Sequence, residues 1–120
     1  MKTHRLVLQT HLNHYGFLFG GELLKWIDEA GYIAANVLCP GNEFVTVGLS
    51  EVVFHKSISA GSILEFDTGL IRKGRSSVTI SIDVYCAFGT DIEKTLVFKT
   101  EITFVAIDKS GNSIPIISKK

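Results

Sequence analysis

Two adjacent glycines, Gly20 and Gly21, stand where the only long helical segment of the sequence begins. The first turn of a helix has N–H groups without intrahelical acceptors, and the helix dipole adds positive potential there. Glycine presents those N–H groups with no side chain in the way, so the pair could polarise a carbonyl and bind the negative oxygen that forms on attack. The alternative is that the glycines only permit a sharp turn or close packing.

Asp28 lies about two turns further along the same segment. On a helical wheel it falls between the apolar and charged sides, next to Leu24, Gly31 and Ala35, so we expect a partly buried carboxylate with open space beside it. Burying a charge without a partner is costly, which makes this position a candidate general base near the candidate carbonyl site. The alternative is that Asp28 caps or forms a salt bridge with a neighbour.

A helix is predicted from residue 19 to about 38, where Pro40 and Gly41 cannot continue it. A short strand at 5–9 and a loop at 10–18 precede this helix. Four long strands follow it, at 43–56, 62–72, 77–86 and 93–108. Turn residues at 72–76, 88–91 and 108–112 separate or follow these strands. Short turns force antiparallel neighbours, so the sequence predicts an α+β fold with an antiparallel sheet wrapped on one helix.

The composition fits a single domain over residues 1–120, with 46% apolar residues. Twelve basic residues balance twelve acidic ones, which argues against a general nucleic-acid binder. No apolar run is long enough to span a membrane, and no signal region is recognisable at the N-terminus. Cys39 and Cys86 match no metal spacing. We therefore expect a cytoplasmic protein with two reduced thiols, no metal and no nucleic-acid or membrane partner.

The pattern N-x-x-G-x-x-F-G-G-x-x-L-x-x-x-D at 13–28 resembles the hot-dog-fold acyl-CoA thioesterases, particularly the YciA-like and cytosolic acyl-CoA hydrolase group. Further similar stretches extend the resemblance over nearly the whole chain, at 45–47, 54–62, 73–85 and 104–116. The resemblance implies a hot-dog fold, with one long central helix wrapped by a five-stranded antiparallel sheet. It also implies hydrolysis of acyl-CoA to a free acid and CoA, with no cofactor because CoA is part of the substrate.

The same resemblance implies at least a homodimer with its two sheets joined edge to edge, and in some members a hexamer built as a trimer of dimers. The active sites would then lie at the dimer interface. Asp28 matches the family's catalytic carboxylate, acting as general base or as nucleophile, and Asn13 matches the asparagine of the preceding loop. Gly20 and Gly21 match the glycines that open the helix and polarise the carbonyl.

A larger set of residues is expected to bind the substrate: Phe19, Thr46, Lys56, Arg72, Lys73, Arg75, Ser76 and Ser77. Most of them lie in the turn before the strand at 77–86, where forked guanidinium groups and hydroxyl donors suit CoA phosphates. Basic turns are also commonly just solvated, so this assignment has a plain alternative. Phe19 could line an acyl tunnel or belong to the core.

Two other functions stay open at this point. One is a non-catalytic hot-dog module that binds acyl-CoA, which would not need a partly buried base. The other is a hydroxyacyl-thioester dehydratase, which would use a histidine and acid pair such as His11 or His14 with Glu22. The chain also departs from the family pattern at several positions: His11, Phe17, Ser57 and Ser62. These departures affect the expected loop shape and substrate range more than the chemistry.

Overall fold

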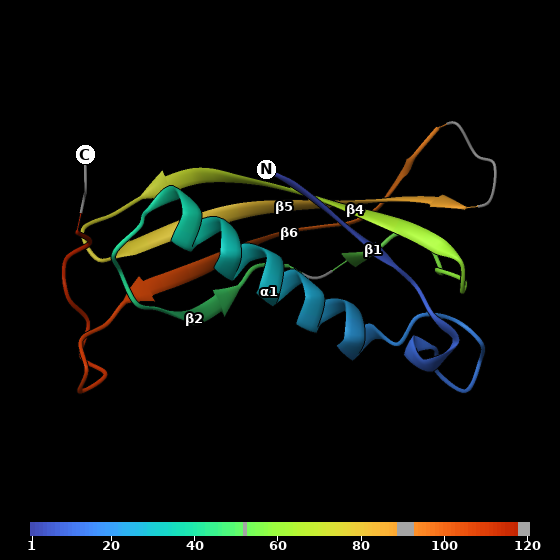
Figure 1. The fold of residues 1–120 in the computed structure, drawn as a ribbon, viewed down its shortest axis with the longest axis horizontal. Coiled ribbons are helices and arrows are strands. Elements are labelled where there is room, and N and C mark those ends of the chain that lie inside the picture. The colour runs from blue at the N-terminus through green and yellow to red at the C-terminus, as the bar shows by residue number, and fades with distance from the viewer. Residues whose placement is uncertain (52, 89–92, 118–120) are drawn as a thin grey trace.

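The α-helix α1 (Gly20–Leu38) lies along the concave face of an antiparallel sheet (Figure 1). A computed structural model describes residues 1–51, 53–88 and 93–117. Its strands are β1 (Lys2–Leu6), β2 (Phe44–Leu49), β3 (Val53–Phe54), β4 (Ser62–Lys73), β5 (Ser77–Phe88) and β6 (Thr95–Ala106). The spatial order is β1-β4-β5-β6-β2, and β3 also pairs with β6. The predicted α+β class is confirmed, and the described residues form six strands in place of the expected five.

The extra strand comes from the segment 43–56, for which one continuous strand was predicted. In the structure β2 ends at Leu49, and β3 is a separate two-residue strand. Ser50 marks the end of β2, because its amide donates to the Glu101 carbonyl while its hydroxyl accepts from the Glu101 amide. Both short strands pair with β6, so the break changes the number of strands and leaves the order of the sheet intact.

The N-terminal strand also differs from its prediction at 5–9, because β1 starts at Lys2 and ends at Leu6. Its register explains the shift: Lys2 lies opposite Asp67, and Leu6 lies opposite Ile63 at the start of β4. Residues 9–11 instead form a short 3₁₀ helix that turns the chain toward α1. The predicted turn at 88–91 falls mostly outside the described residues.

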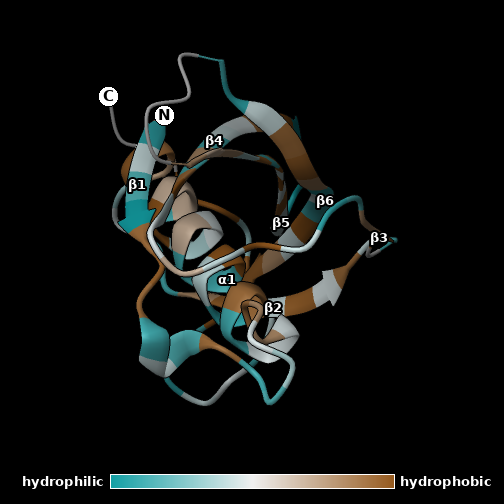
Figure 2. Cartoon of the chain, turned by 90° about the vertical axis from the view of Figure 1, so that its right-hand side faces the viewer, coloured by the Kyte–Doolittle hydropathy of each residue, from teal (hydrophilic) through white to brown (hydrophobic). Residues whose placement is uncertain are grey.

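The buried side of α1 is close to the predicted apolar side, and the sheet curls around it (Figure 2). The buried helix residues are Leu23, Trp26, Ile27, Ala30, Gly31, Ala34 and Ala35. The buried side thus includes the large Trp26, whereas Leu38, the last residue of the helix, is exposed. Gly31 lets the sheet approach, because a Cβ there would lie 2.8 Å from Ile102 Cγ2 and 3.1 Å from Ile82 Cδ1. A larger residue would therefore collide with two side chains of the core.

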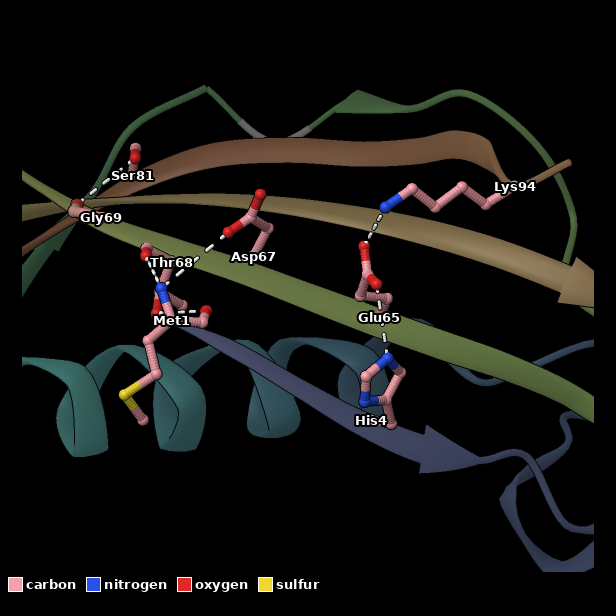
Figure 3. Close-up of polar contacts among 8 residues, drawn as sticks. All are labelled: Met1, His4, Glu65, Asp67, Thr68, Gly69, Ser81 and Lys94. Atoms are coloured by element: carbon pink, nitrogen blue, oxygen red, sulfur yellow. Dashed lines mark hydrogen bonds and ion pairs between the residues drawn. The ribbon is translucent and has the colours of Figure 1, made fainter.

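The outer face of the sheet carries polar side chains. Figure 3 shows Glu65 on β4 between His4 on β1 and Lys94 just before β6. The Lys94 ammonium donates to the Glu65 carboxylate, which holds the pKa of Glu65 below its ordinary value and raises the pKa of Lys94. This ion pair reaches from β4 past β5 to the residue before β6, and at an exposed surface it stabilises the sheet only modestly.

Candidate functional site

The N-terminus of α1 has two backbone N–H groups that no described residue accepts. Phe19 is the N-cap residue, and its carbonyl accepts from the amides of both Glu22 and Leu23. No side chain caps this end, which leaves the N–H groups of Gly20 and Gly21 for another acceptor. Two unpaired amides at a helix N-terminus are the donor arrangement that an oxyanion requires.

The backbone conformation does not require glycine at either position. Among the described residues the positive φ angles belong to Gly16, Gly41, Gly61 and Gly111. At Gly21 the glycine serves close packing, because a Cβ there would lie 2.8 Å from Cε1 of the Phe19 ring. At Gly20 a Cβ would meet only Cζ of Phe54, at an ordinary contact distance of 3.4 Å. The packing alternative therefore accounts for Gly21 better than for Gly20.

Asn13 is held in one orientation by the loop that precedes the helix. Its Oδ1 accepts from the amide of Tyr15 at 2.9 Å and from the amide of Phe17 at 3.2 Å. Because backbone amides only donate, the oxygen must face the loop, and the Nδ2 group is the end left to act on a ligand. Asn13 can therefore act as a hydrogen-bond donor toward a carbonyl or a water.

Asn13 and Gly20 line the same cavity, which has a volume of about 740 Å³. Its walls come from the loop before α1, the start of α1 and the segment 54–58, and they comprise Asn13, Tyr15, Phe17, Leu18, Gly20, Leu23, Phe54, His55, Lys56, Ser57 and Ile58. Of the expected substrate-binding residues, Lys56 lies here. Phe19 is not part of this wall, since its ring packs over Gly21. The cavity brings Gly20, whose amide has no acceptor among the described residues, together with one asparagine and an apolar surface.

Asp28 belongs to a different part of the molecule. Oγ1 of Thr46 on β2 donates a hydrogen bond to Asp28 Oδ1 at 2.6 Å, which orients the carboxylate along the edge of the sheet. The prediction that Asp28 would be partly buried is wrong for the single chain, where it is exposed. Asp28 lies between the two sides of α1 and points toward β2. Because β2 is an edge strand, no further strand covers Asp28, and the carboxylate stays open to solvent.

The separation between Asp28 and the helix N-terminus corrects a second expectation. Asp28 lies eight residues after Gly20 on one continuous helix. With a rise of about 1.5 Å per residue, the two are about 12 Å apart along the axis. A base must come within hydrogen-bonding reach of the water that attacks the carbonyl, so these two groups of one chain cannot act on the same thioester.

The basic turn between β4 and β5 lies near the other end of α1 (Figure 1). The Arg75 carbonyl accepts from the Ile116 amide, and the next residue, Ile117, is hydrogen-bonded to Asn42, whose side chain also donates to the Cys39 carbonyl at the helix C-terminus. Arg72, Lys73 and Arg75 are exposed, whereas Ser76 and Ser77 are partly buried. One chain therefore does not bring this turn together with Lys56, which lies beside the helix N-terminus.

The histidines of the loop make structural contacts. Nδ1 of His11 accepts from the Leu8 amide at 3.0 Å, and the His11 ring meets the edge of Trp26 with 4.8 Å between centroids. His14 packs against Tyr15. Among the described residues no three His, Cys, Asp or Glu side chains come close enough to hold a metal ion together. The loop thus lines the cavity with Asn13 and Tyr15 rather than with a histidine.

Residues 15–92 match the family model described as the thioesterase superfamily. The match covers more than half of the chain. This chain belongs to the thioesterase superfamily. The family resemblance predicted at residues 13–28 is therefore confirmed.

Among curated relatives, an uncharacterized acyl-CoA thioester hydrolase of Haemophilus influenzae is 32% identical over 111 residues, which are 90% of this chain and 71% of that protein. Acyl-coenzyme A thioesterase 11 of Mus musculus is 34% identical over 104 residues, which are 85% of this chain and only 17% of that much longer protein. The matches to two relatives from Buchnera aphidicola span only 58% of the length of each of those proteins. The chain therefore corresponds to one part of some relatives and to most of others.

Solved structures of thioesterases share the fold over almost the whole chain. A hexameric broad-specificity acyl-coenzyme A thioesterase superposes with a TM-score of 0.88 at 29% identity, over 98% of this chain and 81% of its own. An acyl-CoA hydrolase from Staphylococcus aureus, solved with butyryl coenzyme A, coenzyme A and coenzyme A disulfide, gives a TM-score of 0.88 at 28% identity, over 98% and 71% of the two chains. The predicted hot-dog fold is confirmed.

Several cavity residues were missed by the sequence reasoning. Tyr15, Phe54, His55 and Ile58 line the cavity, yet no local pattern marks them as functional. The segment 54–58 was considered only as a turn motif, because its place beside Gly20 depends on the pairing of β3 with β6.

No helix among the described residues combines the length and the apolar character that a membrane span requires.

Proposed function

We propose that this chain is an acyl-CoA thioesterase whose active site is built from two copies. One copy provides the unpaired N–H groups of Gly20 and Gly21, together with Asn13, and the other provides Asp28. The observation that carries this proposal is the spacing on α1, where about 12 Å separate two groups that hydrolysis needs within contact of one thioester. The family membership and the acyl-CoA hydrolases among the relatives support the same chemistry.

In the proposed reaction the thioester oxygen rests on the amides of Gly20 and Gly21. Asp28 takes a proton from a water that attacks the carbonyl carbon, and the amides stabilise the negative charge that develops on the oxygen. The tetrahedral intermediate then expels the CoA thiolate, which receives the proton from Asp28. Thr46 occupies Oδ1 of Asp28, which leaves Oδ2 for the water. Direct attack by the carboxylate, giving an anhydride that water then hydrolyses, is the variant of this mechanism.

The free edge of the sheet supports pairing through β2. This strand ends the sheet, and Val45, Val47 and Leu49 on it are 40%, 57% and 39% exposed. An exposed apolar edge strand with open backbone groups is a surface that soluble proteins normally cover. A two-fold axis beside β2 would bring Asp28 of one copy toward the helix N-terminus of the other. The hexameric state of a similar thioesterase supports association of three such dimers.

The cations expected to bind CoA phosphates fit this two-chain arrangement. Asp28 lies ten residues, or about 15 Å, before the C-terminal end of α1, near the turn that carries Arg72 and Arg75. The copy that gives Asp28 would thus also give the turn, and the copy that gives Gly20 would give Lys56. In this proposal the basic turn of the first copy binds the CoA phosphates, and Lys56 of the second copy lies beside the thioester.

The decisive experiment is thiol release from acyl-CoAs of increasing chain length, measured with a thiol-reactive dye. Asp28→Asn is expected to lower kcat by about 10²–10⁴, the usual value of a general base. Glu29→Gln is the matched control, because Glu29 is the neighbouring exposed carboxylate and pairs with Arg5 away from the cavity. Equal activity of Asp28→Asn and wild type would refute the role of Asp28. Tight binding of CoA thioesters without any thiol release would favour the binding module instead.

A further inference from the structure

One aromatic side chain of the cavity, Phe54, lies next to the proposed carbonyl site. Cζ of its ring is 3.4 Å from the place where a Cβ on Gly20 would be, so the ring edge is in van der Waals range of the helix start. Phe54 is 49% exposed, and it lines the cavity together with Gly20 and Asn13. A large apolar side chain that remains half-exposed inside a cavity is available for contact with a ligand.

The position of the Phe54 ring is fixed from behind. It packs edge to face against Phe98, with 5.1 Å between centroids, and Phe98 is completely buried in the core. β3, which carries Phe54, is paired with β6, opposite Phe98 itself. An aromatic pair of this geometry adds stabilisation beyond the area it buries. Packing against Phe98 therefore holds the Phe54 ring in one orientation, as a fixed wall of the cavity.

The surface around this wall is apolar. Leu18, Leu23 and Ile58 lie in the same cavity and are almost fully buried, so they form its floor. Asn13, His55, Lys56 and Ser57 provide the polar part of the lining. An acyl chain has only apolar surface to bury, whereas the phosphates of CoA need cations. The apolar floor beside Gly20 thus suits the acyl part of the substrate.

We propose that Phe54 is a specificity-determining residue that limits the size of the acyl group accepted beside Gly20. The inference rests on the proposed thioesterase function and adds the residue that sets its substrate range. With the carbonyl oxygen on the Gly20 amide, the first carbons of the acyl chain face the edge of the Phe54 ring. A fixed wall at this place favours small acyl groups over long or bulky ones.

Two substitutions change the wall in opposite directions. The test compares kcat/KM for acetyl-, butyryl-, octanoyl- and palmitoyl-CoA, taking the ratio of the longest to the shortest substrate. Phe54→Ala is expected to raise this ratio by at least about tenfold, because even one methylene in an apolar pocket changes discrimination by about 10- to 200-fold. Phe54→Trp is expected to lower the ratio, and it keeps an aromatic ring against Phe98 if the alanine variant does not fold.

Ile63→Ala is the control, since Ile63 is an apolar side chain of similar exposure, at 51%, and lines a cavity that has no residue in common with that of Phe54. It is expected to keep the wild-type ratio, and light scattering on every variant checks that the assembly is unchanged. A ratio that stays at the wild-type value in both Phe54 variants would overturn the inference, even if all rates fall by a common factor, and would leave the thioesterase function standing. Absence of thiol release by wild type from every substrate would overturn both proposals.

Discussion

The two-chain site can be tested by restoring activity from two inactive variants. Asp28→Asn removes the base of one half of the site, and Gly20→Pro removes one amide donor of the other half. Proline suits this position because Gly20 is the first residue of α1, where proline is favoured and its missing N–H costs no intrahelical bond. Phe19 already has the extended conformation, with φ −66° and ψ 130°, that the residue before a proline requires.

Each variant alone should lose most of its activity. Removing one oxyanion donor typically lowers kcat by about 10²–10³, and removing a general base lowers it by about 10²–10⁴. Gly20→Ala is the control for the proline variant, because it keeps the N–H group and its Cβ would meet only Phe54 at 3.4 Å. The alanine variant is therefore expected to keep far more activity than the proline variant.

Co-expression of the two variants in equal amounts gives the decisive number. Half of the dimers are then mixed, and each mixed dimer has one site with neither substitution and one site with both. The total activity should return to about a quarter of the wild-type value per chain, measured by thiol release. If Gly20 and Asp28 of the same chain formed a site, every site would carry one substitution, and the activity would stay at or below about one hundredth of wild type.

A reciprocal mixture guards against a false positive result. Wild type co-expressed with the double variant Gly20→Pro/Asp28→Asn should give about a quarter of full activity for two-chain sites, because both sites of a mixed dimer are then damaged. Sites contained within one chain would give about a half, since every wild-type chain would stay active. A mixture of single variants without recovery, together with a half in the reciprocal mixture, would refute the proposed architecture.

Two further predictions concern the scaffold. Gly31→Ala should lower the free energy of unfolding in urea by about 1–2 kcal/mol, because overpacking against Ile102 and Ile82 outweighs the gain in helix propensity. The control Gly69→Ala, whose new Cβ would meet only Ser81 Oγ at an ordinary 3.4 Å, should change it by no more than about 0.5 kcal/mol, and equal losses would contradict the packing argument. Glu65→Gln should lower stability near neutral pH but not in acid, since a carboxylate whose pKa is depressed by Lys94 stabilises the fold above its unfolded pKa and loses that effect as the pH falls through its folded value. Urea unfolding at a series of pH values below and above 4.5 checks this, and a difference from wild type that persists in strong acid would contradict it.

The helix and the long strands could be predicted because their signals are local. Proline and glycine after Cys39 end α1 within one residue of the prediction, and alternation of apolar and polar residues marks β5. The position of β1 could not be read in this way, because it is decided by pairing with β4, more than fifty residues away. The break at Ser50 has the same cause, since it depends on hydrogen bonds to Glu101 on β6.

The site residues show the same contrast between local and long-range signals. The glycines, Asn13 and Asp28 stand out by residue type and spacing, and no residue that the structure describes accepts from the amides of Gly20 and Gly21. Phe54 carried no signal, because an aromatic residue in a strand is ordinary until its pairing places it beside Gly20. The separation of Gly20 and Asp28 does follow from the sequence, because eight residues on one helix span about 12 Å.

The exposure of Asp28 follows from the same geometry and bears on how the site becomes active. A carboxylate buried within one chain would cost free energy during folding, since its charge would lose water without gaining a cation. In the single chain Asp28 avoids this cost, because it stays exposed and is oriented by the hydroxyl of Thr46. In the proposed dimer its desolvation occurs only when the second chain brings the carbonyl site. Assembly would then create the low-dielectric surroundings in which both the base and the amide donors act most strongly.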